Sequence, residues 1–135
     1  MSPHLSLLAA ALAMAIALVP SACGQGQEAA TLLRTWDADH DRTLSLDEVR
    51  SAASAEFDKL DVDHEGTLSP EELGGRLTRR AFDAADTDND STLSKEEYLA
   101  LVMQRFREAD ADHDGTLTVQ ELDSLAGHRL MKLLH

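Results

Sequence analysis

The distribution of apolar and polar positions divides the chain into two parts. Residues 5–19 form 15 uncharged and almost wholly apolar positions, whereas every charged side chain lies between Glu28 and the C-terminal end. From residue 31 onward, apolar residues return at regular intervals among polar ones, as they do along the inner faces of amphipathic helices. We therefore predict an apolar leader, followed by one folded helical domain over residues 31–135.

The apolar positions of the second part lie at fixed distances from four acidic segments. One apolar residue lies four places before each segment, and another follows the glutamate that ends it: Leu33, Phe57, Phe82 and Phe106 before, and Val49, Leu73, Tyr98 and Leu122 after. This spacing predicts helices that enter and leave each segment with their apolar faces in a common core. The stretch 98–109 contains no Gly, Pro or Asn, so we expect one helix there, shared by two segments.

The acidic segments form an internal repeat. They begin at Asp37, Asp61, Asp86 and Asp110 and read DADHDRTLSLDE, DVDHEGTLSPEE, DTDNDSTLSKEE and DADHDGTLTVQE. Each has acids at positions 1, 3, 5 and 12, Thr at position 7, Leu at position 8 and a hydroxyl residue at position 9. A single acidic cluster is usually a solvated turn, but four in the same register indicate a repeated metal-binding loop.

This pattern resembles the EF-hand calcium-binding proteins of the calmodulin superfamily, with four loops over residues 37–121. The resemblance implies an all-α fold, an EF-hand array of about five helices joined by four calcium loops. It also implies short β-bridges between loops at the position-8 leucines, Leu44, Leu68, Leu93 and Leu117.

The resemblance, together with the coordination chemistry of Ca²⁺, implies a ligand set for each loop. Positions 1, 3 and 5 offer carboxylates, position 7 its backbone carbonyl, position 9 a site for a bridging water, and position 12 a bidentate glutamate that favours Ca²⁺ over Mg²⁺. Up to four Ca²⁺ ions are expected. The predicted ligands are Asp37, Asp39, Asp41, Thr43 and Glu48; Asp61, Asp63, Glu65, Thr67 and Glu72; Asp86, Asp88, Asp90, Thr92 and Glu97; and Asp110, Asp112, Asp114, Thr116 and Glu121.

The charge of the chain agrees with this interpretation. It has 25 acidic and 12 basic residues and a formal net charge of −13. Four loops with four carboxylates each place 16 of the 25 acids in the predicted metal sites, and four Ca²⁺ ions would change the net charge from −13 to −5. Nucleic acid is not expected as a partner, since phosphate binding depends on clustered Lys and Arg. A single cysteine excludes a disulfide scaffold.

The loops differ at position 6, where a sharp turn favours glycine. Loops 2 and 4 have Gly66 and Gly115, loop 3 has Ser91, and loop 1 has Arg42. We predict that loop 4 binds most tightly and loop 1 least. Position 4 holds His40, His64 and His113 in loops 1, 2 and 4; we expect these side chains to face solvent, the alternative being a transition-metal site or a pH sensor.

The short intervals between loops leave their pairing open. If consecutive loops share one helix, they lie at its opposite ends, so loops 1 and 3 would meet at one end and loops 2 and 4 at the other. The alternative pairs loop 1 with 2 and loop 3 with 4, with helix breaks near residues 51–54 and at Gly74-Gly75. We favour the shared helices.

The leader is typical of an export signal. Its apolar run is too short to cross a bilayer and suits a signal peptide over residues 1–22. Ala22-Cys23-Gly24 resembles the lipobox of bacterial lipoproteins, which implies acylation and membrane attachment at Cys23. The run Gly24-Gln25-Gly26-Gln27 predicts a flexible tether over residues 23–30. We expect a periplasmic or membrane-anchored protein; secretion without an anchor, or a retained apolar helix, is the alternative.

The function we predict is calcium binding in the cell envelope, as a buffer or as a protein that calcium stabilises. The alternative is a calcium sensor that binds an unidentified protein partner through an apolar groove. Sensor grooves are methionine-rich, and only Met103 and Met131 follow the leader. No nucleophile or phosphate-binding motif is present, so we do not expect an enzyme.

Overall fold

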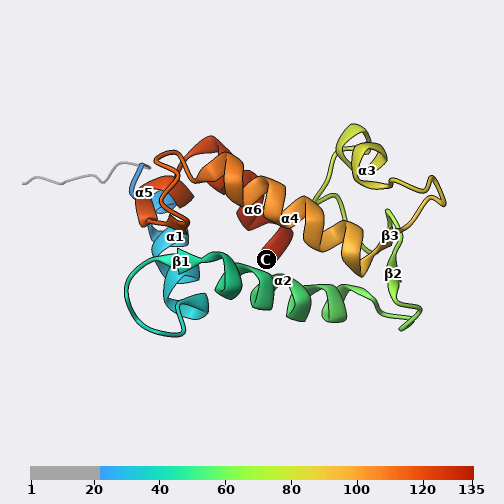
Figure 1. Ribbon diagram of the computed structural model, residues 1–135, viewed down its shortest axis with the longest axis horizontal. Helices are drawn as coiled ribbons and strands as arrows, with labels where there is room; N and C mark the ends of the chain where they lie inside the picture. The colour runs from blue at the N-terminus through green and yellow to red at the C-terminus, as the bar shows by residue number, and fades with distance from the viewer. Residues whose placement is uncertain (1–21) are drawn as a thin grey trace, which may run out of the picture.

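A computed structural model describes residues 22–135 of the chain. In this part it contains six helices and two small antiparallel sheets, which confirms the all-α EF-hand fold (Figure 1). The elements, in chain order, are α1 (Ala22–Trp36), β1 (Leu44–Ser45), α2 (Leu46–Leu60), β2 (Thr67–Leu68), α3 (Arg79–Ala85), β3 (Leu93–Ser94), α4 (Lys95–Ala109), β4 (Thr116–Leu117), α5 (Val119–Leu122) and α6 (Leu125–Leu134).

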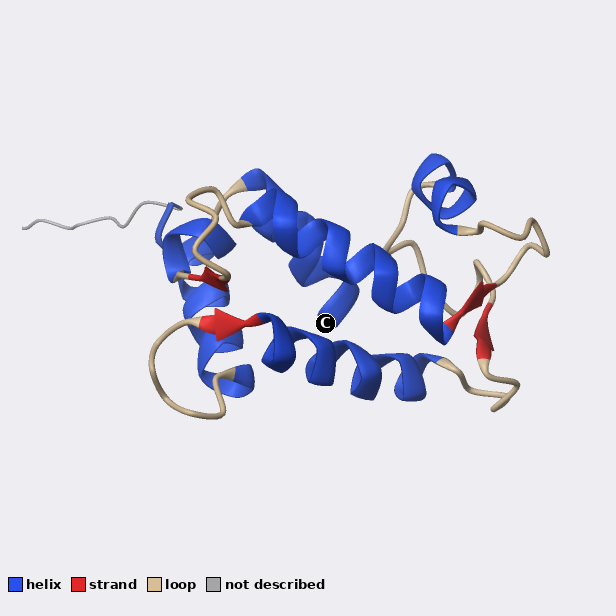
Figure 2. Cartoon of the chain, in the orientation of Figure 1, coloured by secondary structure: helices blue, strands red, loops and turns tan. Residues whose placement is uncertain are grey.

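Helices α2 and α4 connect the two ends of the molecule. Figure 2 shows one strand pair at each end, with α2 and α4 running between them. Strand β1 pairs with β4 and β2 with β3, so loop 1 meets loop 4 and loop 2 meets loop 3. Each of the two long helices therefore leaves a loop at one end and enters the next loop at the other end.

Both predicted loop pairings are wrong. The shared helices exist between loops 1 and 2 and between loops 3 and 4, but none connects loop 2 to loop 3. After a single turn, Gly74 and Gly75 adopt φ of 56° and 82°. This left-handed region ends a helix and is open to glycine at little cost. The chain reverses there, so loop 3 stays beside loop 2, and loop 4 is returned to loop 1.

The core consists of the apolar residues that the spacing singled out. The residues four places before each loop and those after each final glutamate are all buried, as predicted. The position-8 leucines are completely buried within the strand pairs. Phe57 of α2 and Tyr98 of α4 pack with ring centroids 5.6 Å apart, which joins the two long helices. Each such side chain contributes roughly 1.5–3 kcal/mol by leaving water.

The segment that we assigned to a flexible tether differs in the structure. Residues 23–30 belong to α1, and Ala29 is fully buried in the core. The Gln, Glu and Ala residues at 27–30 are helix formers, and Ala29 lies four residues before the buried Leu33 on the same helix face. The predicted signal peptide lies outside the described residues except for Ala22.

Within residues 22–135, none of the helices combines the length and the apolar character needed to cross a membrane.

The helix expected after loop 4 is divided into α5 and α6. Ser124 is the N-cap of α6 and accepts a hydrogen bond from the N–H of Gly127 at 3.0 Å. A Cβ atom on Gly127 would lie 2.2 Å from the carbonyl oxygen of Leu122 and 2.3 Å from that of Glu121. The carbonyl oxygens at the end of α5 thus leave no room for a side chain at residue 127, so the turn between the helices requires glycine there.

Candidate metal centres

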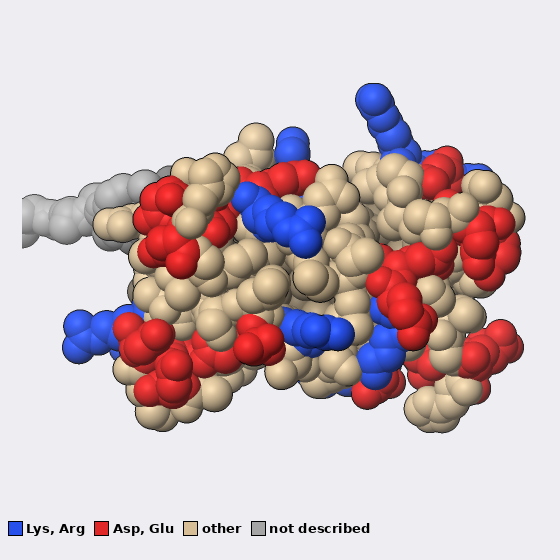
Figure 3. Space-filling model, viewed as in Figure 1, with Lys and Arg blue, Asp and Glu red and all other residues tan. Residues whose placement is uncertain are grey.

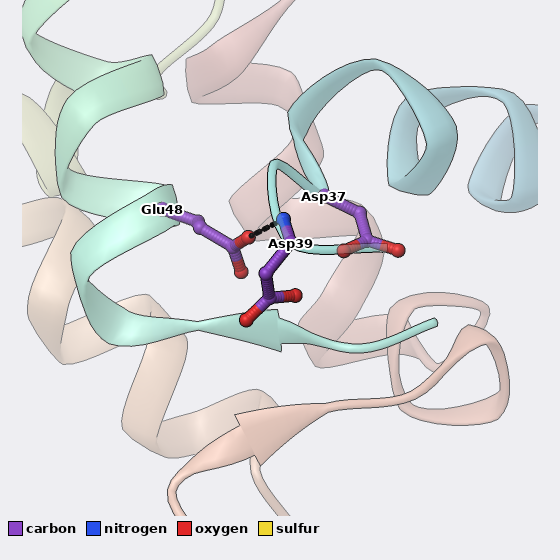
Figure 4. A group of neighbouring side chains, drawn as sticks. All are labelled: Asp37, Asp39 and Glu48. Carbon is purple, nitrogen blue, oxygen red and sulfur yellow. Dashed lines mark hydrogen bonds between the residues drawn. The ribbon is translucent and has the colours of Figure 1, made fainter. Parts of the chain in front are cut away.

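Three carboxylates converge in each of the four loops. They come from positions 1, 3 and 12, and one oxygen of each lies within 4.8 Å of the others. Figure 4 shows the cluster in loop 1, where Glu48 at the start of α2 faces the two aspartates of the loop. The clusters are Asp37, Asp39 and Glu48; Asp61, Asp63 and Glu72; Asp86, Asp88 and Glu97; and Asp110, Asp112 and Glu121.

The size and charge of the clusters fit a calcium ion. Ca²⁺ binds oxygen at about 2.3–2.6 Å, so its ligands lie no more than about 5 Å apart. Within the described part of the chain, every Lys or Arg ion pair uses an acid outside the clusters, such as Glu56 or Asp58. Figure 3 shows acidic side chains gathered toward the two loop-bearing ends of the molecule. Among the described residues, no clustered carboxylate therefore forms an ion pair with a Lys or Arg side chain.

The glutamate at position 12 is held in place by the loop itself. In loop 1, Oε1 of Glu48 accepts from the N–H of Ala38 at 2.7 Å, and Oε2 accepts from the N–H of Ser45 at 2.9 Å. The same two bonds recur in loops 2, 3 and 4, from Val62 and Ser69, Thr87 and Ser94, and Ala111 and Thr118. Both oxygens of each position-12 carboxylate are thus held by hydrogen bonds within the loop.

Position 9 has a role that the sequence analysis missed. Ser45, Ser94 and Thr118 are the N-caps of α2, α4 and α5, and each forms a capping box with the glutamate three residues later. The signal was present as Ser/Thr-x-x-Glu at the start of a predicted helix. Our assignment of position 9 to a bridging water stays a prediction, but the residue type is already explained by the cap.

The aspartate at position 1 is nearly buried and anchors the turn. Asp37 is 7% exposed; its Oδ1 accepts from the N–H of Asp41 at 3.1 Å and its Oδ2 from that of Arg42 at 2.9 Å. The equivalent bonds form in the other loops. These bonds from positions 5 and 6 wrap the loop around the cluster.

The acids at position 5 lie in the loops but outside the clusters. Oδ1 of Asp41 accepts from the N–H and the hydroxyl of Thr43, at 2.8 and 2.7 Å, and Asp90 and Asp114 do the same with Thr92 and Thr116. Thr67 and Glu65 of loop 2 show no such bonds among the described residues. The assignment of positions 5 and 7 as ligands stays a prediction.

The backbone has positive φ at two positions of every loop. At position 6 the values are 72° for Arg42, 85° for Gly66, 69° for Ser91 and 87° for Gly115, as expected for the sharp turn. Position 4 also has positive φ, from 58° to 61°, which we did not predict. Asn and His are among the residues that tolerate this region, which accounts for the residue types found there. The histidines at position 4 are exposed, as predicted.

The loops lower the pKa of some carboxylates and raise the pKa of others. The N–H of Ser94 and the other donors on Glu97 lower the pKa of that carboxyl to about 2. By contrast, desolvation raises the pKa of Asp88, with the negative charges of Asp90 and Glu97 adding to it. The pKa values of Asp39 and Asp112 are also raised, since the charges of neighbouring acids and desolvation outweigh the N–H groups that they accept from. In loops 1, 3 and 4 the carboxyl at position 3 is therefore the one whose pKa the neighbouring acids and desolvation raise.

Comparison with protein families supports the interpretation of these loops. A family model described as EF hand matches residues 55–75, 79–103 and 102–126, together just over half of the chain. These ranges contain loops 2, 3 and 4; loop 1 lies outside them but has the same carboxylate cluster and the same hydrogen bonds. A search of curated proteins gave no match. Proteins of the EF-hand family are generally non-enzymatic calcium binders, and the four acidic clusters of this chain support calcium binding. Because the family model matches more than half of its residues, the chain belongs to the EF-hand family.

Proposed function

We propose that this protein binds Ca²⁺ in the cell envelope and that the ion stabilises its fold. The observation that carries the proposal is the convergence of three carboxylates in each of four loops, none of which forms an ion pair with a Lys or Arg side chain of the described chain. Carboxylates held this close repel one another, so the folded state is costly without a cation. Binding and folding are then coupled, because the ion binds only the folded loops.

Each part of a loop has a definite task in this proposal. Positions 1, 3 and 12 supply the first ligands, and bound Ca²⁺ supplies the positive charge that offsets their repulsion. The hydrogen bonds to Glu48, and to its equivalents in the other loops, fix the carboxylate so that one of its oxygens lies within 4.8 Å of an oxygen of each aspartate. A bidentate glutamate raises the coordination number above the six that Mg²⁺ prefers, which favours Ca²⁺.

The envelope location is supported by the sequence alone. The apolar run at residues 5–19 has the length of a signal-peptide core, and Cys23 follows it in a lipobox-like context. Exported proteins meet abundant calcium, so loops of modest affinity would be filled there. Mass spectrometry of the protein from its host would show whether it begins at Cys23 and carries acyl chains.

The test of calcium binding compares two triple variants of equal charge change. Glu48→Gln, Glu72→Gln and Glu97→Gln remove the position-12 carboxylates of loops 1 to 3. Asp47→Asn, Glu71→Gln and Glu96→Gln remove the exposed acids immediately before them. We expect calorimetry to show up to four sites in the parent and the control, and at most one in the first variant. Equal calcium uptake by the two variants would refute the assignment.

The stabilising role is tested separately by thermal unfolding with circular dichroism. We expect the melting temperature of the parent to rise with calcium concentration and to fall in EGTA, as for any ligand that binds only the folded state. Calcium binding without a change in melting temperature would leave the protein a calcium binder but refute the stabilising role.

A second candidate function is a calcium sensor. It is favoured by a groove of about 340 Å³ between α3 and α4, which is lined by apolar residues such as Ala81, Ala100 and Leu101 and also by polar ones such as Glu97 and Arg105. An open groove of this kind could hold part of a protein partner. A dye that binds apolar surface, such as ANS, separates the two: a sensor gains dye fluorescence on adding calcium, whereas a protein that calcium only stabilises loses it.

A further inference from the structure

We propose that the four loops are coupled in a closed ring, in which helices and β-bridges alternate as the links. The ring runs from loop 1 through α2 to loop 2, across β2–β3 to loop 3, through α4 to loop 4, and across β4–β1 back to loop 1. This inference rests on the proposed calcium binding and adds how one site responds to another.

Each helical link connects ligands of two loops through one continuous helix. Helix α2 has Glu48 of loop 1 in its first turn, and its C-cap is Asp61 of loop 2, whose N–H donates to the carbonyl of Phe57 at 2.9 Å. Helix α4 has the same arrangement, with Glu97 of loop 3 in the first turn and Asp110 of loop 4 at the C-cap. Neither helix contains Gly or Pro, so neither has an internal break.

Each β-bridge places the residue that holds one position-12 glutamate opposite position 7 of the partner loop. Ser45, which caps α2 and binds Glu48, is opposite Thr116 of loop 4, and Leu44 is opposite Leu117. At the other end Ser94, which caps α4 and binds Glu97, is opposite Thr67 of loop 2. A shift of β4 or β2 therefore displaces the cap that holds Glu48 or Glu97 in the partner loop.

The ring gives every loop two neighbours and one opposite loop. Loop 1 is linked to loop 2 by α2 and to loop 4 by the bridge, while loop 3 lies across the ring from it. Isolated helices of 15 residues are marginal in water, so α2 depends on its two ends and on packing for its order. Fixing one end with a bound ion lowers the conformational entropy that remains to be lost at the other end, which produces positive coupling.

The test monitors one backbone amide in each of the four loops, at the same loop position. The position-6 N–H groups of Arg42, Gly66, Ser91 and Gly115 each donate to the position-1 aspartate at 2.9–3.0 Å. Their ¹H–¹⁵N NMR signals therefore report each loop during a calcium titration. The variant is Glu48→Gln, and the matched control is Asp47→Asn, which removes an exposed carboxylate from the same turn of α2.

In Glu48→Gln we expect the calcium midpoints of Gly66 and Gly115 to rise at least about fivefold, and that of Ser91 to rise less. The Asp47→Asn control should leave all four within about twofold of the parent. If only Gly115 responds, coupling passes through the bridge alone and the ring is refuted. A midpoint for Gly66 within about twofold of the parent refutes it equally.

Reciprocity provides a second measurement if Glu48→Gln folds poorly. Linkage requires the coupling between loops 1 and 2 to be reciprocal. The variant Glu72→Gln should therefore raise the calcium midpoint of the Arg42 amide by the same factor by which Glu48→Gln raises that of the Gly66 amide. A calcium midpoint of the Arg42 amide that stays the same in Glu72→Gln would overturn the helical link. Failure of the proposed function can be distinguished from failure of the ring, because without calcium binding none of the NMR signals of the four position-6 amides would shift in the parent on adding calcium.

Discussion

Tyr98 donates its phenolic hydrogen to the carbonyl oxygen of Leu133, and so connects α4 to the last turn of α6. The last carbonyls of a helix lack partners within it, and here Tyr98 supplies one. Nη1 of Arg76 adds a second donor, toward the carbonyls of Lys132 and His135, while its Nη2 lies 3.1 Å from the buried Glu56 of α2. The end of α6 is thus tied to both long helices.

Tyr98 should resist ionisation for as long as the protein is folded. Burial raises the pKa of its phenol above the ordinary value of about 10. Because the folded-state pKa is raised, the stability that the neutral phenol contributes is complete below pH 10 and is lost as the pH rises further. Tyr98 is the only tyrosine, so absorbance at 295 nm follows it alone. We expect tyrosinate to appear above pH 10, together with loss of the circular dichroism signal; a titration near pH 10 with the helices intact would contradict this.

Replacing Arg42 with glycine should strengthen calcium binding at loop 1. Arg42 has a φ of 72°, in the region that costs a side chain about 1–2 kcal/mol. Relief of that strain in the bound loop corresponds to as much as about a tenfold gain in affinity. Calorimetry on Arg42→Gly measures it. The converse variant, Gly115→Arg, should weaken loop 4 by a similar factor, and a gain of affinity in Gly115→Arg would show that backbone strain does not rank the loops.

The residues explain why some features were predictable and others were not. The core positions and the loops follow from local spacing, so Leu33, Phe57 and Phe82 could be placed without coordinates. Loop pairing depended on where one segment reverses, and Gly74-Gly75 was compatible with more than one arrangement. The positive φ at position 4 could not be predicted from a glycine, because this position holds His or Asn, which also tolerate positive φ. Ala29 was missed because two nearby glycines made the start of α1 resemble a linker.

Removing the hydroxyl of Ser94 should affect both a helix and a calcium site. The Ser94 side chain accepts from the N–H of Glu97 at 3.2 Å as the N-cap of α4. Loss of a cap costs about 1 kcal/mol, and Glu97 would lose part of the support for its orientation. We expect Ser94→Ala to lower the free energy of unfolding in EGTA and to weaken binding at loop 3. Ser94→Thr is the control, since Thr118 fills this position in loop 4; equal losses in both variants would show that the hydroxyl is not the cause.

Adding one methyl group at Gly127 should destabilise the protein and weaken loop 4 together. A Cβ there would lie 2.2–2.3 Å from the carbonyl oxygens of Leu122 and Glu121, so α5 and α6 would have to separate. Overpacking of this kind costs about 1–3 kcal/mol, and the displaced backbone carries the position-12 ligand Glu121. Gly26→Ala in α1 is the matched control, because nothing lies within 4 Å of its Cβ position and alanine favours a helix by about 0.5–1 kcal/mol. We expect denaturant unfolding in EGTA to show opposite shifts for the two variants, and the Gly115 amide to need more calcium only in Gly127→Ala. If Gly127→Ala unfolds like the parent, the close approach of α5 and α6 is not a feature of the protein in solution.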